Sequence, residues 1–282
     1  MKISKSAVLL CIVLIVGILF GFSVFRKGKP VDSKNVTSSV SQKTTQTAKE
    51  TTTEKPKREI KPDDKLIALT FDDGPYSPVT EKILDTLEEN NSVATFFVVG
   101  NRLEGNQEYQ NSLKRAYDLG CEIGSHTYNH TYLTNMSAES RAEELSQTDN
   151  LVKQITGKGT TILRPPGGFM VDGVEYPLIM WSVDSMDWKY REVNMDYDEV
   201  MNSIFDGCII LMHDLYSASA EAAARFIPEL ISQGYKFVTV SELAEARGID
   251  LVNGQSFYSA EPQIPEESET EESTTFLDNI VE

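Results

Sequence analysis

The middle of this chain alternates short apolar runs with segments of helical periodicity, and this alternation restricts the fold more than any other feature. Residues 66–71 and 94–99 are apolar runs of strand length. Between them, Val79, Ile83, Leu84 and Leu87 have the spacing of an amphipathic helix. Strands that alternate with helices form a parallel sheet, which is either open or closed into a barrel.

The same alternation continues as far as residue 246. Further strands are expected at 121–124, 162–163, 179–183, 209–212 and 237–239, and further helices at 109–119, 137–155, 197–203, 219–233 and 241–246. Ser137 is a favourable N-cap for the longest of these helices. We therefore predict one α/β domain over residues 63–253, which is long enough to bury a core.

The segments outside this domain have different compositions. Residues 1–29 contain an uncharged apolar run from Ala7 to Phe25, just long enough to span a hydrocarbon core of about 30 Å. It lacks a good small-residue cleavage site, so an uncleaved anchor is favoured over a signal peptide. Residues 30–62 resemble a disordered Ser/Thr/Lys tether, and residues 254–282 an acidic disordered tail. We expect a single-pass membrane protein with its α/β domain outside the cell, or a secreted one if the N-terminal segment is cleaved.

Charge limits the kinds of partner that this chain can bind. The formal net charge is −17, with 43 acidic residues against 26 Lys and Arg. Such a surface disfavours nucleic acid, whose binding depends on clustered Lys and Arg. The basic tether could lie against anionic lipid, or it could be merely solvated. No feature of the sequence implies a protein partner.

Three histidines are the most informative residues for chemistry. His126 and His130 stand four residues apart, which would place them on one face of a helical turn, and His213 follows the apolar run 209–212. Two histidines and one carboxylate form a metal site with an open position, which is typical of catalytic rather than structural zinc. Zinc is the first choice of divalent metal, although cobalt, nickel or iron also suit such ligands.

Five separated motifs follow the ends of expected strands. They are Thr70–Pro75, Ser125–His130, Arg164–Gly168, Asp184–Trp188 and Leu211–His213. Together, over residues 63–248, they resemble the NodB-like polysaccharide deacetylases, carbohydrate esterase family 4. The resemblance implies a distorted (β/α) barrel whose active face lies at the carboxyl ends of the strands.

The resemblance also implies roles for single residues around the metal. Asp73 would be the carboxylate ligand beside His126 and His130. Asp72, next to the metal but not bound to it, would act as general base. Arg164 would orient Asp72, because a neighbouring cation favours the charged form of a carboxylate.

The remaining roles concern the leaving group and the acetyl group. His213 would protonate the leaving amine, and Asp187 would raise its basicity; a buried histidine of the core is the alternative for His213. Gly167 would donate a backbone N–H to the oxyanion. Trp188 and Leu211 would form an apolar pocket for the acetyl methyl group, with core packing as the competing role for Leu211.

Two departures from the family pattern concern residues 167–181, which would form one wall of the substrate groove. Gly167 stands where the family often has an aromatic residue, so a backbone donor remains but a glycan-facing side chain is lost. The segment between Gly168 and Trp181 is too short for the usual covering helix. We therefore expect one crossover helix of the barrel to be missing.

The motifs favour a metal-dependent deacetylase that removes N-acetyl groups from cell-wall glycan outside the cell and releases acetate. N-acetylglucosamine of peptidoglycan is the favoured substrate. One alternative keeps the machinery but acts on O-acetyl esters of polysaccharide. Another is a catalytically inactive glycan-binding module.

Overall fold

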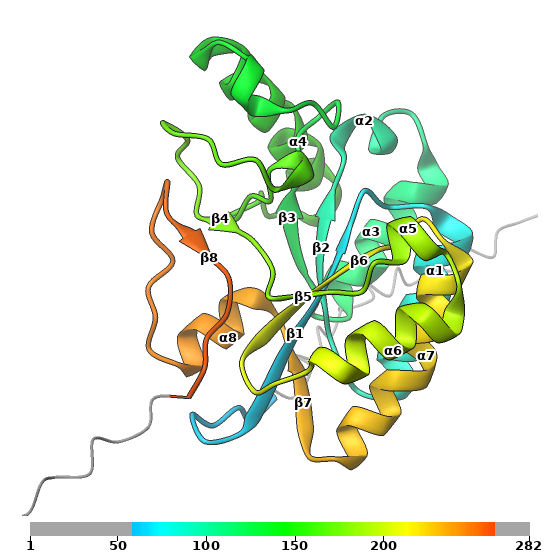
Figure 1. Cartoon of the computed structure of the whole chain (residues 1–282). Coiled ribbons are helices and arrows are strands. Elements are labelled where there is room, and N and C mark those ends of the chain that lie inside the picture. The colour runs from blue at the N-terminus through cyan, green and yellow to red at the C-terminus, as the bar shows by residue number, and fades with distance from the viewer. Residues whose placement is uncertain (1–57, 263–282) are drawn as a thin grey trace, which may run out of the picture. The chain divides into compact units, whose positions relative to one another are not determined.

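The computed structural model describes residues 58–262 of the chain (Figure 1). The predicted anchor at 1–29, the tether as far as residue 57 and the tail from residue 263 lie outside the described residues. Between residues 58 and 262, none of the helices combines the length and the apolar character needed to cross a bilayer.

The main sheet is built around β1 (Lys65–Asp72) and is entirely parallel. Its order is β3 (Glu122–Ser125), β2 (Thr95–Val98), β1, β6 (Cys208–His213) and β5 (Val183–Asp184). The first half of β1 also pairs with β7 (Tyr235–Val238), and its second half pairs with β2. Parallel neighbours need a crossover connection, so this sheet follows from the alternation seen in the sequence.

The sheet closes into a barrel through short pairings. β4 (Leu178–Ile179) pairs with β8 (Ser256–Phe257), side by side in Figure 1. Single bridges complete the circuit, from Ser125 to Leu163, from Leu163 to Leu178, and from Ser259 to Cys208. The predicted distorted barrel is therefore confirmed. Residues 169–177 contain no helix, as expected for the missing crossover.

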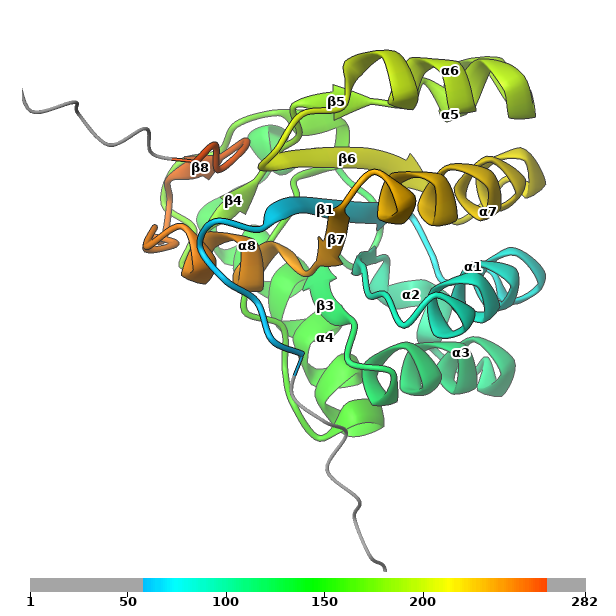
Figure 2. The ribbon, with the colours of Figure 1, turned by 90° about the horizontal axis from the view of Figure 1, so that it is seen from below.

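Helices cover the outside of the sheet. In Figure 2, α6 (Val193–Ser203), α7 (Ser217–Ser232), α1 (Ser77–Glu89) and α3 (Gln107–Asp118) lie side by side. The others are α2 (Gly100–Leu103), α4 (Ala138–Thr156), α5 (Asp187–Tyr190) and α8 (Val240–Ala246). Ser137 caps α4 as predicted, because its hydroxyl accepts from the Ser140 N–H. The two short helices α2 and α5 were not predicted, and the expected strand at 179–183 is divided between β4 and β5.

Alternation along β1 separates two parts of the core. Ile67, Leu69 and Phe71 pack against the covering helices, whereas Leu66 and Ala68 join the core inside the barrel. Successive side chains of a strand point to opposite faces, so Thr70 and Asp72 share the interior face with Leu66 and Ala68. The interior is therefore apolar at the start of β1 and polar at its carboxyl end.

The predicted boundaries of the domain were too narrow at both ends. Residues 254–260, assigned to the acidic tail, form β8 and bury Phe257 and Ala260, because the barrel needs them to close. The Ala260 N–H donates to the Gly207 carbonyl at 2.8 Å. Arg58, assigned to the tether, forms an ion pair with Glu242 at 2.5 Å.

Substitution of Phe257 tests whether this segment belongs to the folded domain. Phe257 is 9% exposed and packs in the barrel interior, whereas its neighbour Tyr258 is 48% exposed. We expect Phe257→Ala to lower the free energy of unfolding by about 3 kcal/mol, since it leaves a cavity. The control Tyr258→Ala should lower it by about 0.5 kcal/mol or less. Equal and small effects in urea unfolding would contradict the assignment.

Candidate active site

Two loops at the carboxyl ends of β1 and β3 bring the three predicted metal ligands together. Ligand atoms of Asp73, His126 and His130 all lie within 4.8 Å of one another. Asp73 Oδ1 is 3.0 Å from His130 Nε2 and 3.3 Å from His126 Nε2. Among the described residues they form a group of three, so one side remains open, as in catalytic rather than structural sites.

Left-handed backbone conformations create this arrangement. Asp73 has φ 74°, Thr127 has φ 67° and His130 has φ 55°. Residues 126–130 therefore form a loop, and the two histidines are not brought together by a helical turn. In an extended strand Asp72 and Asp73 would point to opposite faces. The positive φ of Asp73 turns the chain so that both carboxylates approach His126.

A hydrogen bond to a backbone carbonyl fixes His126 in the tautomer that can bind a cation. Its Nδ1 lies 2.7 Å from the Arg164 carbonyl oxygen. A carbonyl can only accept, so Nδ1 carries the proton and Nε2 keeps its lone pair toward Asp73. Asp73 Oδ1 is buried and has no hydrogen bond of ordinary geometry. Two imidazole nitrogens and one orphaned carboxylate oxygen fit a divalent metal ion.

The electrostatics of Asp73 agree with a ligand role. Burial raises the pKa of Asp73, but the adjacent imidazoles of His126 and His130 outweigh that effect and hold the pKa well below its ordinary range. Asp73 therefore stays ionised at neutral pH. In the same contact, the Asp73 carboxylate raises the pKa of His130.

Asp72 is held by the fully buried guanidinium of Arg164. Arg164 Nη1 donates to Asp72 Oδ1 at 2.8 Å and to Thr70 Oγ1 at 2.6 Å. Its Nε and Nη2 donate to the carbonyls of Ile179 and Met180. The other Asp72 oxygen, Oδ2, lies 3.8 Å from His126 Nε2. Asp72 is thus fixed beside the ligand group with one oxygen facing it.

His213 stands across from Asp72 at the end of β6 and is paired with Asp187. Asp72 and His213 are register partners in neighbouring strands. His213 Nδ1 lies 2.7 Å from Asp187 Oδ1, and Asp187 Oδ2 accepts from the His213 backbone N–H and from Ser219 Oγ. Burial lowers the pKa of His213, but the hydrogen bond to Asp187 outweighs it and raises the pKa to about 9.

The three predicted substrate contacts take different places. Gly167 has φ 68°, and a Cβ there would lie 2.9 Å from the Phe169 ring and 3.1 Å from Tyr132. Trp188 is exposed on α5, where its indole hydrogen-bonds Asp184. Leu211 is buried on β6, two residues before His213. Their contact with an acetyl group stays a prediction.

Sequence reasoning missed the residue that holds the histidine loop. Glu144 is a buried residue of α4, and its carboxylate accepts from the backbone N–H groups of Tyr128 and Asn129 and from the Asn129 side chain. A signal was present, since Glu144 shares one face of the helix with Thr148 and Val152. An acid on the buried face of a helix needs hydrogen-bond partners.

The fold and the site define a barrel with an open divalent-metal site flanked by a fixed carboxylate and a paired histidine. A family model described as polysaccharide deacetylase matches residues 59–177. A peptidoglycan-N-acetylglucosamine deacetylase of Bacillus cereus is 36% identical over 197 residues, which are 66% of this chain and 91% of that protein. The chain belongs to the polysaccharide deacetylase family, carbohydrate esterase family 4.

Other members of the family differ in the substrates for which they are named. The peptidoglycan-N-acetylmuramic acid deacetylase PdaC of Bacillus subtilis is 41% identical over 197 residues, 68% of this chain but only 42% of PdaC. The match to the solved structure of PdaC covers 67% of this chain and 94% of the chain in that structure. The sequence identity is 40% and the TM-score is 0.64. An acetyl xylan esterase of Clostridium thermocellum in complex with a cobalt ion, 31% identical, has a TM-score of 0.66 and covers 71% of this chain and 100% of that one.

Removal of one ligand tests the metal site. We expect His130→Ala to weaken zinc binding about 100-fold or more, because even outer contacts of metal ligands contribute 10-fold to 100-fold. His213→Ala is the matched control, since His213 bonds Asp187 and lies outside the ligand group. Competition with a chromophoric chelator measures both affinities. Equal zinc affinity in His130→Ala and in the unaltered chain would exclude His130 as a ligand.

Proposed function

We propose that this chain is a metal-dependent deacetylase that hydrolyses N-acetyl groups of cell-wall glycan and releases acetate. The observation that carries the proposal is that Asp72, beside the open ligand group, and His213, paired with Asp187, end neighbouring strands as register partners. A base and an acid so placed can act on opposite ends of one scissile amide bond. Family membership supports the same reaction class.

The side chains divide the proton transfers between them. A divalent cation, when bound, would act as a Lewis acid on the acetyl carbonyl and on the attacking water. Asp72 takes a proton from that water as its oxygen bonds to the carbonyl carbon. His213 gives its proton to the nitrogen as the C–N bond breaks, which leaves acetate and a free amine. Arg164 and Asp187 hold Asp72 and His213 in position.

Several finer statements belong to the proposal. The names of relatives support N-acetylglucosamine or N-acetylmuramic acid in peptidoglycan, and we favour N-acetylglucosamine. Two imidazoles and one carboxylate favour zinc, and cobalt, nickel or iron would also bind such a site. An N-terminal anchor with a tether would hold the domain near a polymer just outside the membrane.

Product analysis tests the reaction. We expect the metal-loaded chain to release equal amounts of acetate and new primary amine from N-acetylglucosamine oligomers, and a chelator to abolish both. Asp72→Asn should lower kcat by about 10²-fold to 10⁴-fold because the general base is lost. Asp118→Asn, an exposed acid of α3, is the matched control. Acetate released from O-acetylated xylan, with no amine from any N-acetyl glycan, would replace this proposal with an esterase.

The pH profile tests the acid role of His213. The acid must be protonated, so activity should decline as the pH rises above about 9, the raised pKa of His213. In Asp187→Asn the burial of His213 persists while the carboxylate charge is gone, so the pKa falls. We expect the alkaline limb of kcat to move to lower pH by more than about one unit. An alkaline limb that does not move in a folded Asp187→Asn protein would contradict this role.

A further inference from the structure

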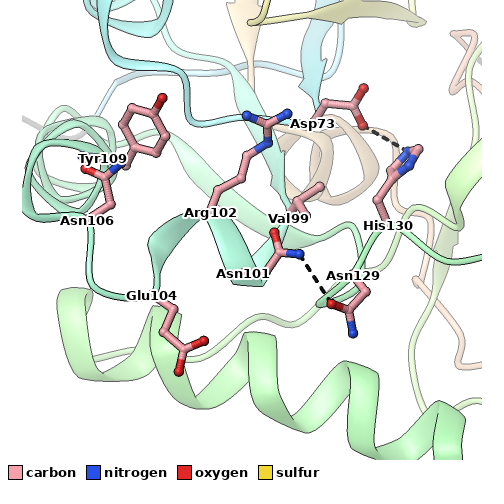
Figure 3. Close-up of a pocket in the computed structure, with 9 residues that line it drawn as sticks. All are labelled: Asp73, Val99, Asn101, Arg102, Glu104, Asn106, Tyr109, Asn129 and His130. Atoms are coloured by element: carbon pink, nitrogen blue, oxygen red, sulfur yellow. Dashed lines mark hydrogen bonds and ion pairs between the residues drawn. The ribbon is translucent and has the colours of Figure 1, made fainter. Parts of the chain in front are cut away.

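A polar cavity of about 560 Å³ opens beside the ligand group. Asp73 and His130 form one end of it (Figure 3). The other residues that line it are Val99, Asn101, Arg102, Glu104, Asn106, Tyr109 and Asn129. Because two metal ligands belong to its wall, whatever fills the cavity lies next to the reacting acetyl group. Among the residues that line the cavity, only Asp73 and His130 have a predicted role in the site.

Arg102 is the cation of this cavity. Its side chain extends from α2 toward Asp73 in Figure 3. Burial raises the pKa of the nearby Asp214 carboxyl to about 7, and the charge of Arg102 partly opposes that rise. In residues 58–262, the Arg102 side chain makes no hydrogen bond or ion pair. By contrast, Arg58, Arg164 and Arg247 each bind a carboxylate.

The other cavity residues leave Arg102 free to bind a ligand. Asn101 and Asn129 are hydrogen-bonded to each other at 3.3 Å below His130 and present amide groups suited to sugar hydroxyls. Glu104 lies away from the guanidinium in Figure 3 and accepts a hydrogen bond from the Tyr128 hydroxyl. The cavity therefore presents a guanidinium that has no hydrogen bond or ion pair within residues 58–262, beside two amide side chains; the carboxylates of Asp73 and Glu104 also belong to its wall.

We propose that Arg102 is a specificity-determining residue, which binds a carboxylate carried by the glycan next to the sugar that is deacetylated. This inference rests on the proposed deacetylase function and deepens it. A planar guanidinium suits a carboxylate, which it can bind through two parallel hydrogen bonds. In a chain of net charge −17, one free arginine at this point favours an anionic glycan locally.

Two groups of peptidoglycan supply such a carboxylate. One is the lactyl group of a muramic acid that carries no peptide. The other is a free carboxylate of the peptide stem, which is present only where the lactyl group is amidated. Both are the same ligand chemistry for Arg102, and oligomers of defined structure distinguish them.

The test compares Arg102→Gln with the unaltered, zinc-loaded full chain. The substrates are chitotetraose, a peptide-free oligomer of alternating N-acetylglucosamine and N-acetylmuramic acid, the same oligomer blocked by alaninamide, and the same oligomer carrying an alanyl-isoglutamate stem. We expect Arg102→Gln to raise KM about tenfold to a hundredfold for a carboxylate-bearing oligomer, because a charge-assisted hydrogen bond is lost. kcat on all substrates, and KM for chitotetraose and the blocked oligomer, should not change.

Controls separate this role from a structural one. Arg225→Gln removes an exposed arginine of α7 that contacts Tyr197 and Asn194, and it should change no KM. Arg102→Lys keeps the charge without the planar fork and should give an intermediate KM. The carboxylate selectivity of the unaltered chain should weaken as salt is added.

The outcomes are distinct. An effect confined to the peptide-free acid identifies the lactyl carboxylate, and one confined to the dipeptide oligomer identifies the stem. Equal effects on charged and neutral glycans, or none, would overturn the inference. If the unaltered chain deacetylates none of the oligomers, the proposed function fails, and calorimetric binding of the same oligomers still tests Arg102. Equal affinity of Arg102→Gln and the unaltered chain for the anionic oligomers would then overturn the inference independently.

Discussion

The buried ion pair between Arg164 and Asp72 is the interaction on which the rest of the site depends. The Arg164 side chain links Thr70 and Asp72 of β1 to the carbonyls of Ile179 and Met180. Its backbone carbonyl also fixes the tautomer of His126. One residue therefore sets the base, orients a metal ligand and joins opposite walls of the barrel. Removing one partner of such a pair leaves an uncompensated buried charge, which is strongly destabilising.

Strand periodicity explains how a stable core and a reactive site share one barrel. On the interior face of β1, Leu66 and Ala68 lie in the apolar core, and Thr70 and Asp72 follow toward the carboxyl end. β6 repeats the order, with Ile209 in the core, then Leu211 and His213. Burial of the residues near the start of each strand stabilises the fold. The same alternation places the residues near the carboxyl end of each strand in the site.

These regularities were predictable from sequence because they are periodic and local. The apolar runs predicted the strands and their ends, whereas the missing helix and the carboxylate ligand followed from the resemblance carried by the five motifs. The loop conformation at His126–His130 could not be predicted, because local spacing does not show positive φ. Asp73 and His130 are of residue types that tolerate positive φ, but the β-branched Thr127 is strained there, and the surrounding structure must hold it. Glu144 does so for the histidine loop from a distant helix. Long-range contacts of this kind, like the pairing of β8, leave little local trace.

The late position of β8 has a consequence for how the domain forms. More than half of the described residues lie between β1 and its partner β6 in the sequence. The ring of strands closes only when Ser259 pairs with Cys208. Until then the edges of β4 and β6 lack their partners, and exposed strand edges favour wrong pairings. A ribosome making this chain therefore delivers the sealing strand after every catalytic residue. The barrel must close after the domain has been synthesised, and its non-local pairing makes that step slow compared with helix formation.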